Sequence, residues 1–404
     1  MSCLLILRAD GSILGRPGYD PATRLFHRPM PGLTLPDIPE KPSQEDAARA
    51  ANFIHEELLY DFPFADDASW ANIFAALLTP VVRHAIPGPV PIAVKDTPQA
   101  GTGKTMLQDI VAIVATGRGG PMLSPPMRRD SDEEWSKVIT SALLKGSTII
   151  IFDNCDGLLR SPSLAMAVTA RVYGARILGS NRQVEMPINV SWYVNGNNIQ
   201  LGGDLPRRCY WIRLDARMSR PWKRTDFKHK NLISWVMENR GKLIVALLTM
   251  ARAWFVAGRP EPDCPVLGSF EVWCRTVGGI LQFAGVRGFL ANLEEMYEKA
   301  DMEGQEWGAF LLAWRERYGD AVVLVKDLVK DLAEEESPLR DALPGQLVEA
   351  QAKKGGSLAR TLGWALGKKE GVYFGDAGVH LERVAKADHR TSANGWRVVA
   401  YDSA

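Results

Sequence analysis

The sequence predicts an α/β fold in which a mostly parallel sheet is flanked by helices, with helical segments on both sides of it and a smaller domain at the C-terminal end. Between residues 89 and 215, short β-branched runs alternate with segments of helical apolar spacing, as in βαβ units. Residues 226–300 carry helical spacing only. From residue 303 onward, three helical segments precede strand-like pieces separated by turns, which is typical of a winged helix.

The composition is that of a globular protein. The 404 residues are enough for two or three domains, and 46% of them are hydrophobic against 24% charged. No apolar run reaches the length of a membrane span, and the N-terminal stretch lacks the basic flank of a secretion signal, so we expect a cytoplasmic protein. The five cysteines form no C-x-x-C pair and the six histidines form no ligand cluster, so neither a disulfide framework nor a zinc site is predicted. A net charge of +1 excludes a wholly basic nucleic-acid coat protein but allows local basic clusters.

The N-terminal region predicts an irregular segment followed by helices. Residues 1–43 are rich in proline and glycine, which favours an extended segment wrapped on another domain. A helix is predicted to begin after Ser43, a candidate N-cap, and a second one to cover residues 68–86. The predicted domains are an extended segment with a helical collar at 1–84, a core at 85–225, a helical lid at 226–302 and a C-terminal domain at 303–404.

The stretch "KDTPQAGTGKTML", residues 95–107, has the glycine spacing of a loop that cradles phosphates, although Pro98 stands where the usual pattern begins with glycine. A short β-branched run precedes it, and a helical pattern ended by Gly117 follows it. Strand, glycine turn and helix together allow backbone N–H groups to converge on an anion at a helix N-terminus. Lys104 would neutralise β and γ oxygens, and Thr105 would ligate Mg²⁺. The predicted cofactors are ATP and Mg²⁺, bound by Ala100, Gly101, Thr102, Gly103, Lys104 and Thr105.

A second motif, "GSTIIIFDN" at 146–154, is an apolar strand that ends in an acid. A carboxylate at the C-terminal end of a parallel strand next to the phosphate loop is suited to Mg²⁺, so Asp153 is predicted as the Walker B aspartate. We expect Lys104 and Asp153 to meet around one magnesium-bound triphosphate on adjoining strands. The next residue, Asn154, cannot accept a proton from the attacking water. The general base is then Asp156, Glu133 or Glu134, or hydrolysis is slow.

A third segment, residues 190–215, gives a strand, a polar Gly-Asn-Asn turn and two arginines before another strand. Asn197 could hold the hydrolytic water against the γ-phosphate, the role called sensor 1. From their position, Arg207 or Arg208 could reach the phosphate of a neighbouring subunit as an arginine finger. Surface turns with an arginine–aspartate pair are the structural alternative.

Taken together, "AGTGKT", "IIIFDN", "YGARILGS", "WYVNGNN" and "GGDLPRRCYWIRLD" resemble the helicase-like AAA+ ATPases encoded by phages and mobile elements. These are related to superfamily-III helicases and to the minichromosome-maintenance (MCM) helicases. The resemblance covers about residues 85–300. It implies an AAA+ P-loop ATPase core with an N-terminal helical region, a helical lid and a C-terminal winged-helix domain. It also implies a homo-oligomeric ring, usually a hexamer, that binds ATP between subunits and moves loops along DNA, with a primase or another replication protein as partner.

In such proteins a hairpin before the sensor-1 strand carries a basic tip. Residues 176–187, "RILGSNRQVEMP", occupy that position, with Gly179, Ser180 and Asn181 as turn residues. Arg182 and Arg176 would contact the phosphates of the translocating strand. A solvated hairpin tip is the alternative.

Two further basic segments are candidates for contacts with nucleotide or DNA. In residues 216–230, Arg220 or Arg224 is either a sensor-2 arginine or part of a solvated linker. Residues 357–369 resemble the helix that a winged domain presents, where Arg360, Lys368 and Lys369 would face DNA, whereas we expect Trp364 in the core. Winged domains also serve as protein docking surfaces.

The predicted function is a hydrolase: an ATP-dependent DNA helicase or translocase that replicates a phage or mobile element. The alternative is a nucleotide-switched loader or an origin-binding regulator with little unwinding activity. Pro98 and Asn154 favour the alternative, because both depart from the usual catalytic pattern. Stimulation of ATP hydrolysis by DNA separates the two.

Overall fold

The computed structural model describes residues 6–28, 32–126, 132–177, 182–334, 336–352, 357–375, 378–388 and 393–400. The chain divides into two compact units, Met1–Ala300 and Asp301–Ala404. Each unit buries its own cluster of hydrophobic side chains, so each has a core that is independent of the other.

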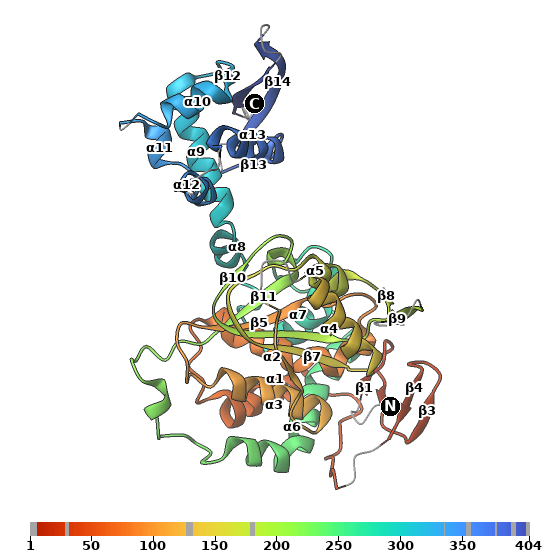
Figure 1. Ribbon diagram of the computed structural model, residues 1–404. Helices are drawn as coiled ribbons and strands as arrows, with labels where there is room; N and C mark the ends of the chain where they lie inside the picture. The colour runs from red at the N-terminus through yellow and green to blue at the C-terminus, as the bar shows by residue number, and fades with distance from the viewer. Residues whose placement is uncertain are drawn as a thin grey trace. The chain divides into compact units, whose positions relative to one another are not determined.

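A five-stranded sheet forms the centre of the first unit (Figure 1), in the order β11-β5-β10-β7-β6 with every neighbouring pair parallel. The prediction of a mostly parallel sheet is confirmed. The order corrects one expectation, because β10 lies between β5 and β7, so Lys104 and Asp153 do not follow adjoining strands. The carboxyl ends of β5, β7 and β10 still meet at one edge of the sheet, where α/β proteins bind ligands. The strands are β5 (Ile92–Thr97), β6 (Met122–Leu123), β7 (Ile149–Leu159), β10 (Ser191–Leu201) and β11 (Cys209–Arg213).

The helices of the first unit include those predicted as a lid, which belong to the same compact unit as the sheet. The buried guanidinium of Arg240 on α6 donates to the carbonyls of Ile113 (2.8 Å) and Val114 (3.1 Å), near the end of α3. The Ile113 carbonyl also accepts from the cap N–H of Gly117, whereas Val114 belongs to the last turn, where a helix leaves carbonyls without intrahelical partners. The helices are α2 (Asp67–Val82), α3 (Lys104–Thr116), α4 (Asp132–Leu144), α5 (Pro162–Thr169), α6 (Leu232–Val256), α7 (Glu271–Phe283) and α8 (Leu293–Ala300). Within the part of the chain that the structure describes, every helix falls short of the length and apolar character that a membrane span requires.

The N-terminal segment is partly regular, which the sequence analysis did not predict. Two small antiparallel ribbons form, β1 (Ile6–Leu7) with β2 (Ile13–Leu14), and β3 (Gly18–Asp20) with β4 (Leu25–His27). Strands of two or three residues are too short to show a period in the sequence.

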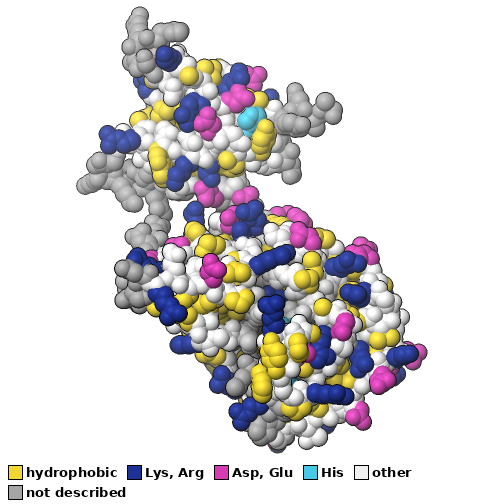
Figure 2. Space-filling view, turned by 90° about the vertical axis from the view of Figure 1, so that its right-hand side faces the viewer, with side chains coloured by type: hydrophobic (Ala, Val, Ile, Leu, Met, Phe, Trp, Pro, Cys, Tyr) yellow, Lys and Arg dark blue, Asp and Glu magenta, His cyan; other side chains and the backbone are white. Residues whose placement is uncertain are grey.

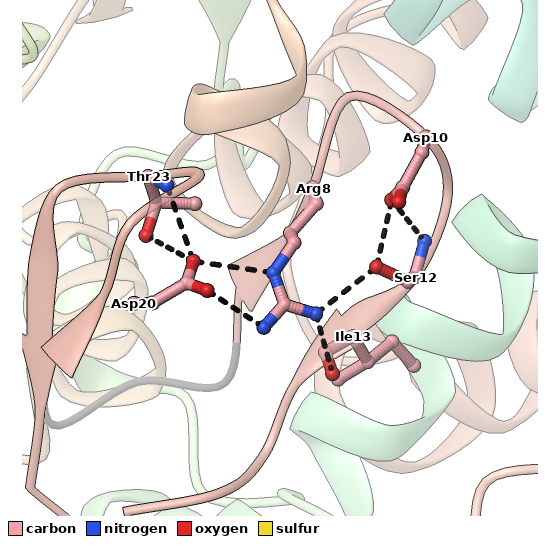
Figure 3. Close-up of polar contacts among 6 residues, drawn as sticks. All are labelled: Arg8, Asp10, Ser12, Ile13, Asp20 and Thr23. Atoms are coloured by element: carbon pink, nitrogen blue, oxygen red, sulfur yellow. Dashed lines mark hydrogen bonds and ion pairs between the residues drawn. The ribbon is translucent and has the colours of Figure 1, made fainter. Parts of the chain in front are cut away.

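Arg8 connects these two ribbons (Figure 3). Its guanidinium donates to both carboxylate oxygens of Asp20, at 3.1 and 3.0 Å, and to the hydroxyl of Ser12 and the carbonyl of Ile13. The Asp20 carboxylate also accepts from Thr23, and hydrogen bonds to Arg8 and Thr23 lower the pKa of Asp20 to about 2.

Residues 32–42 contain no helix or strand, as predicted, and run across α6. A side chain at Gly241 of α6 would place its Cβ only 2.0 Å from the carbonyl oxygen of Thr34. Glycine is therefore required where the two backbones meet. Helix α1 (Gln44–Ile54) begins after Ser43, as predicted, with Ser43 and Asp46 forming a reciprocal capping box. A π-helical turn, His55–Leu59, continues it.

The second unit consists of helices and a four-stranded antiparallel sheet of order β12-β15-β14-β13. Trp307, Phe310, Trp314 and Trp396 are buried in its core. The prediction that Trp364 belongs to this core is wrong, because its side chain is 63% exposed. The elements are α9 (Met302–Tyr318), β12 (Val323–Leu324), α10 (Val325–Asp331), α11 (Pro338–Asp341), α12 (Gly345–Ala352), α13 (Leu358–Lys369), β13 (Tyr373–Phe374), β14 (Val379–Asp388) and β15 (Ala393–Val399).

Candidate functional site

The phosphate loop, residues 98–105, connects the end of β5 to the first turn of α3. Gly101 and Gly103 both have left-handed backbones, with φ of +85° and +92°, a conformation that side-chain-bearing residues rarely adopt. The hydroxyl of Thr102 lies 3.1 Å from that of Thr97, which ties the loop back to the strand. The loop therefore has the strand, glycine and helix context that the sequence predicted, and the N–H groups of the first helical turn remain without intrahelical acceptors.

Lys104 points from this loop to the irregular middle part of β10. Its ammonium donates to the carbonyl of Gly196 at 2.6 Å and to the amide oxygen of Asn197 at 2.9 Å. The side chain is buried. Burial lowers the pKa of Lys104, and the nearby carboxylates of Asp153 and Asp96 act in the opposite direction. The structure thus brings together Lys104 and Asn197, and places both within the field of Asp153.

Asp153 lies at the bend of a strand and not at its end. Strand β7 continues to Leu159, and its register with β10 shifts between Phe152 and Cys155, where Asn154 has a φ of +61°. A β-bulge of this kind redirects a side chain, and it is common beside active sites. The Asp153 carboxylate is buried and accepts a hydrogen bond of 3.0 Å from the side-chain amide of Asn195.

The Gly-Asn-Asn segment, residues 196–198, was predicted as a turn, but it lies within a strand. Strand β10 continues through it to Leu201, with a second register shift between Asn197 and Gln200 and a left-handed Asn198 (φ +49°). The Asn198 amide donates to the carbonyl of Pro98 at 3.3 Å, so the bulge of β10 contacts the start of the phosphate loop. Pro98, the departure from the usual motif, is thereby part of the site.

A buried polar cluster lies beside Asp153, and the sequence analysis missed it. Lys95 on β5 is fully buried, donates to the side-chain oxygen of Gln108 on α3, and sits 4.7 Å from the centre of the Tyr193 ring. Asn195 is the register partner of Lys95, and among the described residues neither its Oδ1 nor Nε2 of Gln108 has a hydrogen-bond partner. The signal was available in the sequence, since "KD" interrupts the otherwise apolar strand "PIAVKDT".

We predict that this lysine makes stability depend on pH. Burial lowers the pKa of Lys95 from its ordinary 10.5 to about 7, against the opposing charge of Asp153. Between these two values the unfolded chain binds more protons than the folded one, so the free energy of unfolding rises with pH across this window and the penalty is complete below pH 7. Relative to Lys95→Met, the wild type should gain up to about 1.4 kcal/mol per pH unit. Urea unfolding of the wild type and of Lys95→Met at pH 7 and 9.5 measures the free energy of unfolding of each protein. If the two free energies change by the same amount between these pH values, the prediction is contradicted.

The three candidate general bases have exposed side chains. Glu133 and Glu134 on α4 are exposed and form ion pairs of 2.9 and 2.7 Å with Lys137. Asp156 is exposed and is the register partner of Asn197 across the strands. Asp96, at the end of β5, is a further buried carboxylate, and burial raises its pKa.

The two arginines before β11 bind within their own chain. Arg207 forms an ion pair of 2.6 Å with Asp204 and is largely exposed. Arg208 donates to the backbone carbonyl of Asp204 at 2.6 Å, and burial lowers its pKa. The structure therefore contains the arginine–aspartate pair of the structural alternative, and a role toward a neighbouring subunit stays a prediction.

The predicted DNA-contacting hairpin is present as β8 (Val172–Arg176) and β9 (Gln183–Pro187), which pair antiparallel. Arg176 and Arg182 are both exposed at its described end. The turn residues Gly179, Ser180 and Asn181 lie outside the described residues. On the face drawn in Figure 2, Lys and Arg side chains are scattered among apolar and acidic ones, so contacts with DNA would depend on individual side chains.

The basic residues of the second unit differ in their surroundings. On α13, Arg360 is exposed, and the ammonium of Lys368 lies 3.7 Å from the ring centre of the exposed Trp364. Lys369 is only 21% exposed and forms an ion pair of 2.8 Å with Glu303. Arg360 is thus exposed to solvent, whereas Lys368 already contacts Trp364 and Lys369 already pairs with Glu303.

No protein-family model and no curated protein matches this chain. Among solved structures it is similar to an apo form of the NrS-1 C-terminal region, at 12% identity and a TM-score of 0.42, with 83% of this chain and 69% of that chain covered. It is also similar to JCV helicase, at 14% identity and a TM-score of 0.26, with 64% of this chain and 72% of that chain covered. At these scores and identities, the likeness establishes neither a family nor an activity for this chain.

Proposed function

We propose that this chain is a DNA-dependent ATPase that uses ATP hydrolysis to move along or unwind DNA. The observation that carries the proposal is the position of Lys104, whose ammonium sits between the glycine loop and the sensor residue Asn197, in the field of Asp153. Among the described residues the hydrogen bonds of this ammonium go to neutral oxygens, and a buried lysine held in this way is available to an anionic ligand. Helicase action, a hexameric ring and a role in replicating a mobile element are the finer parts of this proposal.

The residues at the edge of the sheet fit a magnesium-bound triphosphate. The N–H groups of residues 100–105 bind the phosphates, and Lys104 moves its ammonium from Gly196 and Asn197 to the β and γ oxygens. Thr105, which is exposed, would supply a hydroxyl to the metal, and Asp153, held by Asn195, would supply the carboxylate. Bound Mg²⁺ contributes neutralisation of the phosphate charge. Once the Lys104 ammonium no longer donates to it, the side chain of Asn197 can orient the attacking water.

Contacts in trans and with DNA complete the motor. Arg207 or Arg208 leaves Asp204 to stabilise the γ-phosphate of a neighbouring subunit. Arg176 and Arg182 on the hairpin bind the backbone of the strand that is moved. Arg360, Lys368 and Lys369 form the DNA contact of the second unit, with Lys369 exchanging Glu303 for phosphate.

A nucleotide-switched loader is the second candidate, and one observation favours it. Asn154 is exposed with a left-handed backbone, and the candidate acids Glu133 and Glu134 are both engaged with Lys137. Slow hydrolysis would follow if no carboxylate orients the water.

The test is steady-state ATP hydrolysis by the full chain with and without single-stranded DNA. We expect DNA to raise the turnover by about tenfold or more, as for a motor whose subunits close on DNA, and the stimulation to fall steeply with added salt because phosphate contacts release counterions. Hydrolysis that is indifferent to DNA would support the switch. No hydrolysis and no ATP binding would remove the enzymatic proposal.

A further inference from the structure

An aromatic side chain from a distant segment lies against the outer side of the phosphate loop. Trp222 belongs to the short 3-10 turn Pro221–Lys223. A Cβ added at Gly101 would lie 3.1 Å from Cε3, 3.2 Å from Cβ and 3.3 Å from the backbone nitrogen of Trp222. The side chain is nevertheless 62% exposed. The indole therefore borders the loop while most of its surface stays open to solvent.

Hydrogen bonds on both sides hold this segment in place. Before the tryptophan, the side-chain amide of Gln99 in the loop donates to the carbonyl of Met218 at 2.9 Å. After it, Arg224 donates to the carbonyl of Asp61 at 2.9 Å, and the backbone N–H of Lys228 donates to the Asp61 carboxylate at 2.8 Å. These hydrogen bonds fix the backbone around Trp222. The exposed position of its ring beside the phosphate loop is therefore a feature of the fold and not the result of a loose loop.

The second glycine of the loop has an aromatic neighbour as well. A Cβ at Gly103 would lie 3.2 Å from Cε1 of Phe62, which is close to Phe64 with ring centres 6.3 Å apart. Met106, the residue after Thr105, is 43% exposed. Aromatic side chains from two separate segments, Trp222 and Phe62, thus lie next to the two glycines of the loop, and Met106 is exposed just after it.

We propose that Trp222 is the platform on which the nucleobase of the bound nucleotide stacks, with Phe62 and Met106 completing an apolar base site. The proposal rests on the proposed function, because it assigns the base of the same triphosphate that the loop binds. A nucleobase offers a flat apolar face, and an indole that is already held in place loses little conformational entropy when a base stacks on it. The base site is built from side chains of residues 62, 106 and 222, and it is separate from the backbone groups that bind phosphate.

Calorimetric titration of the full chain with Mg-ATP and with magnesium tripolyphosphate separates the two sites. Trp222→Ala should weaken ATP binding by about 5- to 100-fold, the cost of one base–aromatic stack, and leave tripolyphosphate binding within about twofold. Trp222→Phe should retain most of the ATP affinity. Trp364→Ala, which removes an equally exposed tryptophan from the second unit, should change neither.

Two outcomes would overturn the assignment: equal weakening of both ligands, which makes Trp222 a support of the loop, or no weakening of either. A different variant, Lys104→Ala, tests the proposed function. If Lys104→Ala binds ATP and tripolyphosphate as tightly as the wild type, the loop does not bind phosphate, and the base site falls with it. If Lys104→Ala loses both ligands while Trp222→Ala behaves like the wild type, only the base site is wrong.

Discussion

Lys104→Ala is expected to reduce ATP hydrolysis to background and to weaken the binding of ATP by about 10- to 100-fold. The reason is the single buried ammonium at the loop, which in this structure donates to Gly196 and Asn197 and which a triphosphate would draw to its oxygens. A hydrogen bond between charged groups is worth about 1.5–3 kcal/mol, and a donor aimed at transition-state charge contributes about 100-fold or more to the rate. Phosphate release during steady-state turnover measures the effect.

Lys145→Ala is the matched control, because Lys145 is exposed at the end of α4 and outside the site. It should hydrolyse ATP at the wild-type rate. The thermal midpoint of both variants should stay near that of the wild type, which separates a loss of chemistry from a loss of fold. Hydrolysis by Lys104→Ala within about tenfold of the wild type would contradict the role given to this lysine.

The local parts of this site could be predicted from the sequence because their signals are local. Glycines at 101 and 103 are needed for left-handed backbone, and a β-branched strand before them and an amphipathic helix after them leave few other arrangements. The Ser43 N-cap was found in the same way, whereas the hairpin of β8 and β9 was expected from the family resemblance.

The remaining parts depend on contacts between segments that are distant in the sequence. The insertion of β10 between β5 and β7 is a pairing between segments that are distant in the sequence, and no single run of residues encodes it. The bulges that turn Asn154 and Asn198 left-handed arise from the pairing of two strands. Trp222 meets Gly101 only because Asp61 and Gln99 hold its segment.

Trp364 is a residue whose burial was predicted wrongly from the sequence. Its helical spacing resembles that of core residues, yet the cation of Lys368 covers its ring at the surface of the second unit. An amphipathic pattern predicts which residues lie on one side of a helix, but a tryptophan at the edge of that side can point either way. Burial of single residues at such edges needs the tertiary structure.

Asp153→Asn is expected to lower ATP hydrolysis by about 100-fold or more while ATP binding without Mg²⁺ stays within about threefold of the wild type. The asparagine keeps the size of the side chain and an oxygen that can accept from Asn195, so the bulge of β7 is preserved. It removes the charge that Mg²⁺ requires from its carboxylate ligand. Titration with ATP at zero and at saturating Mg²⁺ should show that the metal tightens binding to the wild type and has little effect on the variant.

Asp320→Asn provides the comparison, since Asp320 is 79% exposed in the second unit. A magnesium dependence of Asp153→Asn equal to that of the wild type would show that the metal is held elsewhere.

Asp153→Asn also tests the role given to the buried lysines, because the charge of Asp153 opposes the effect of burial on the pKa of Lys95 and of Lys104. When that charge is removed, the pKa of each lysine should fall further. The pH dependence of unfolding assigned to Lys95 should therefore begin at a lower pH in Asp153→Asn, even where no nucleotide is present.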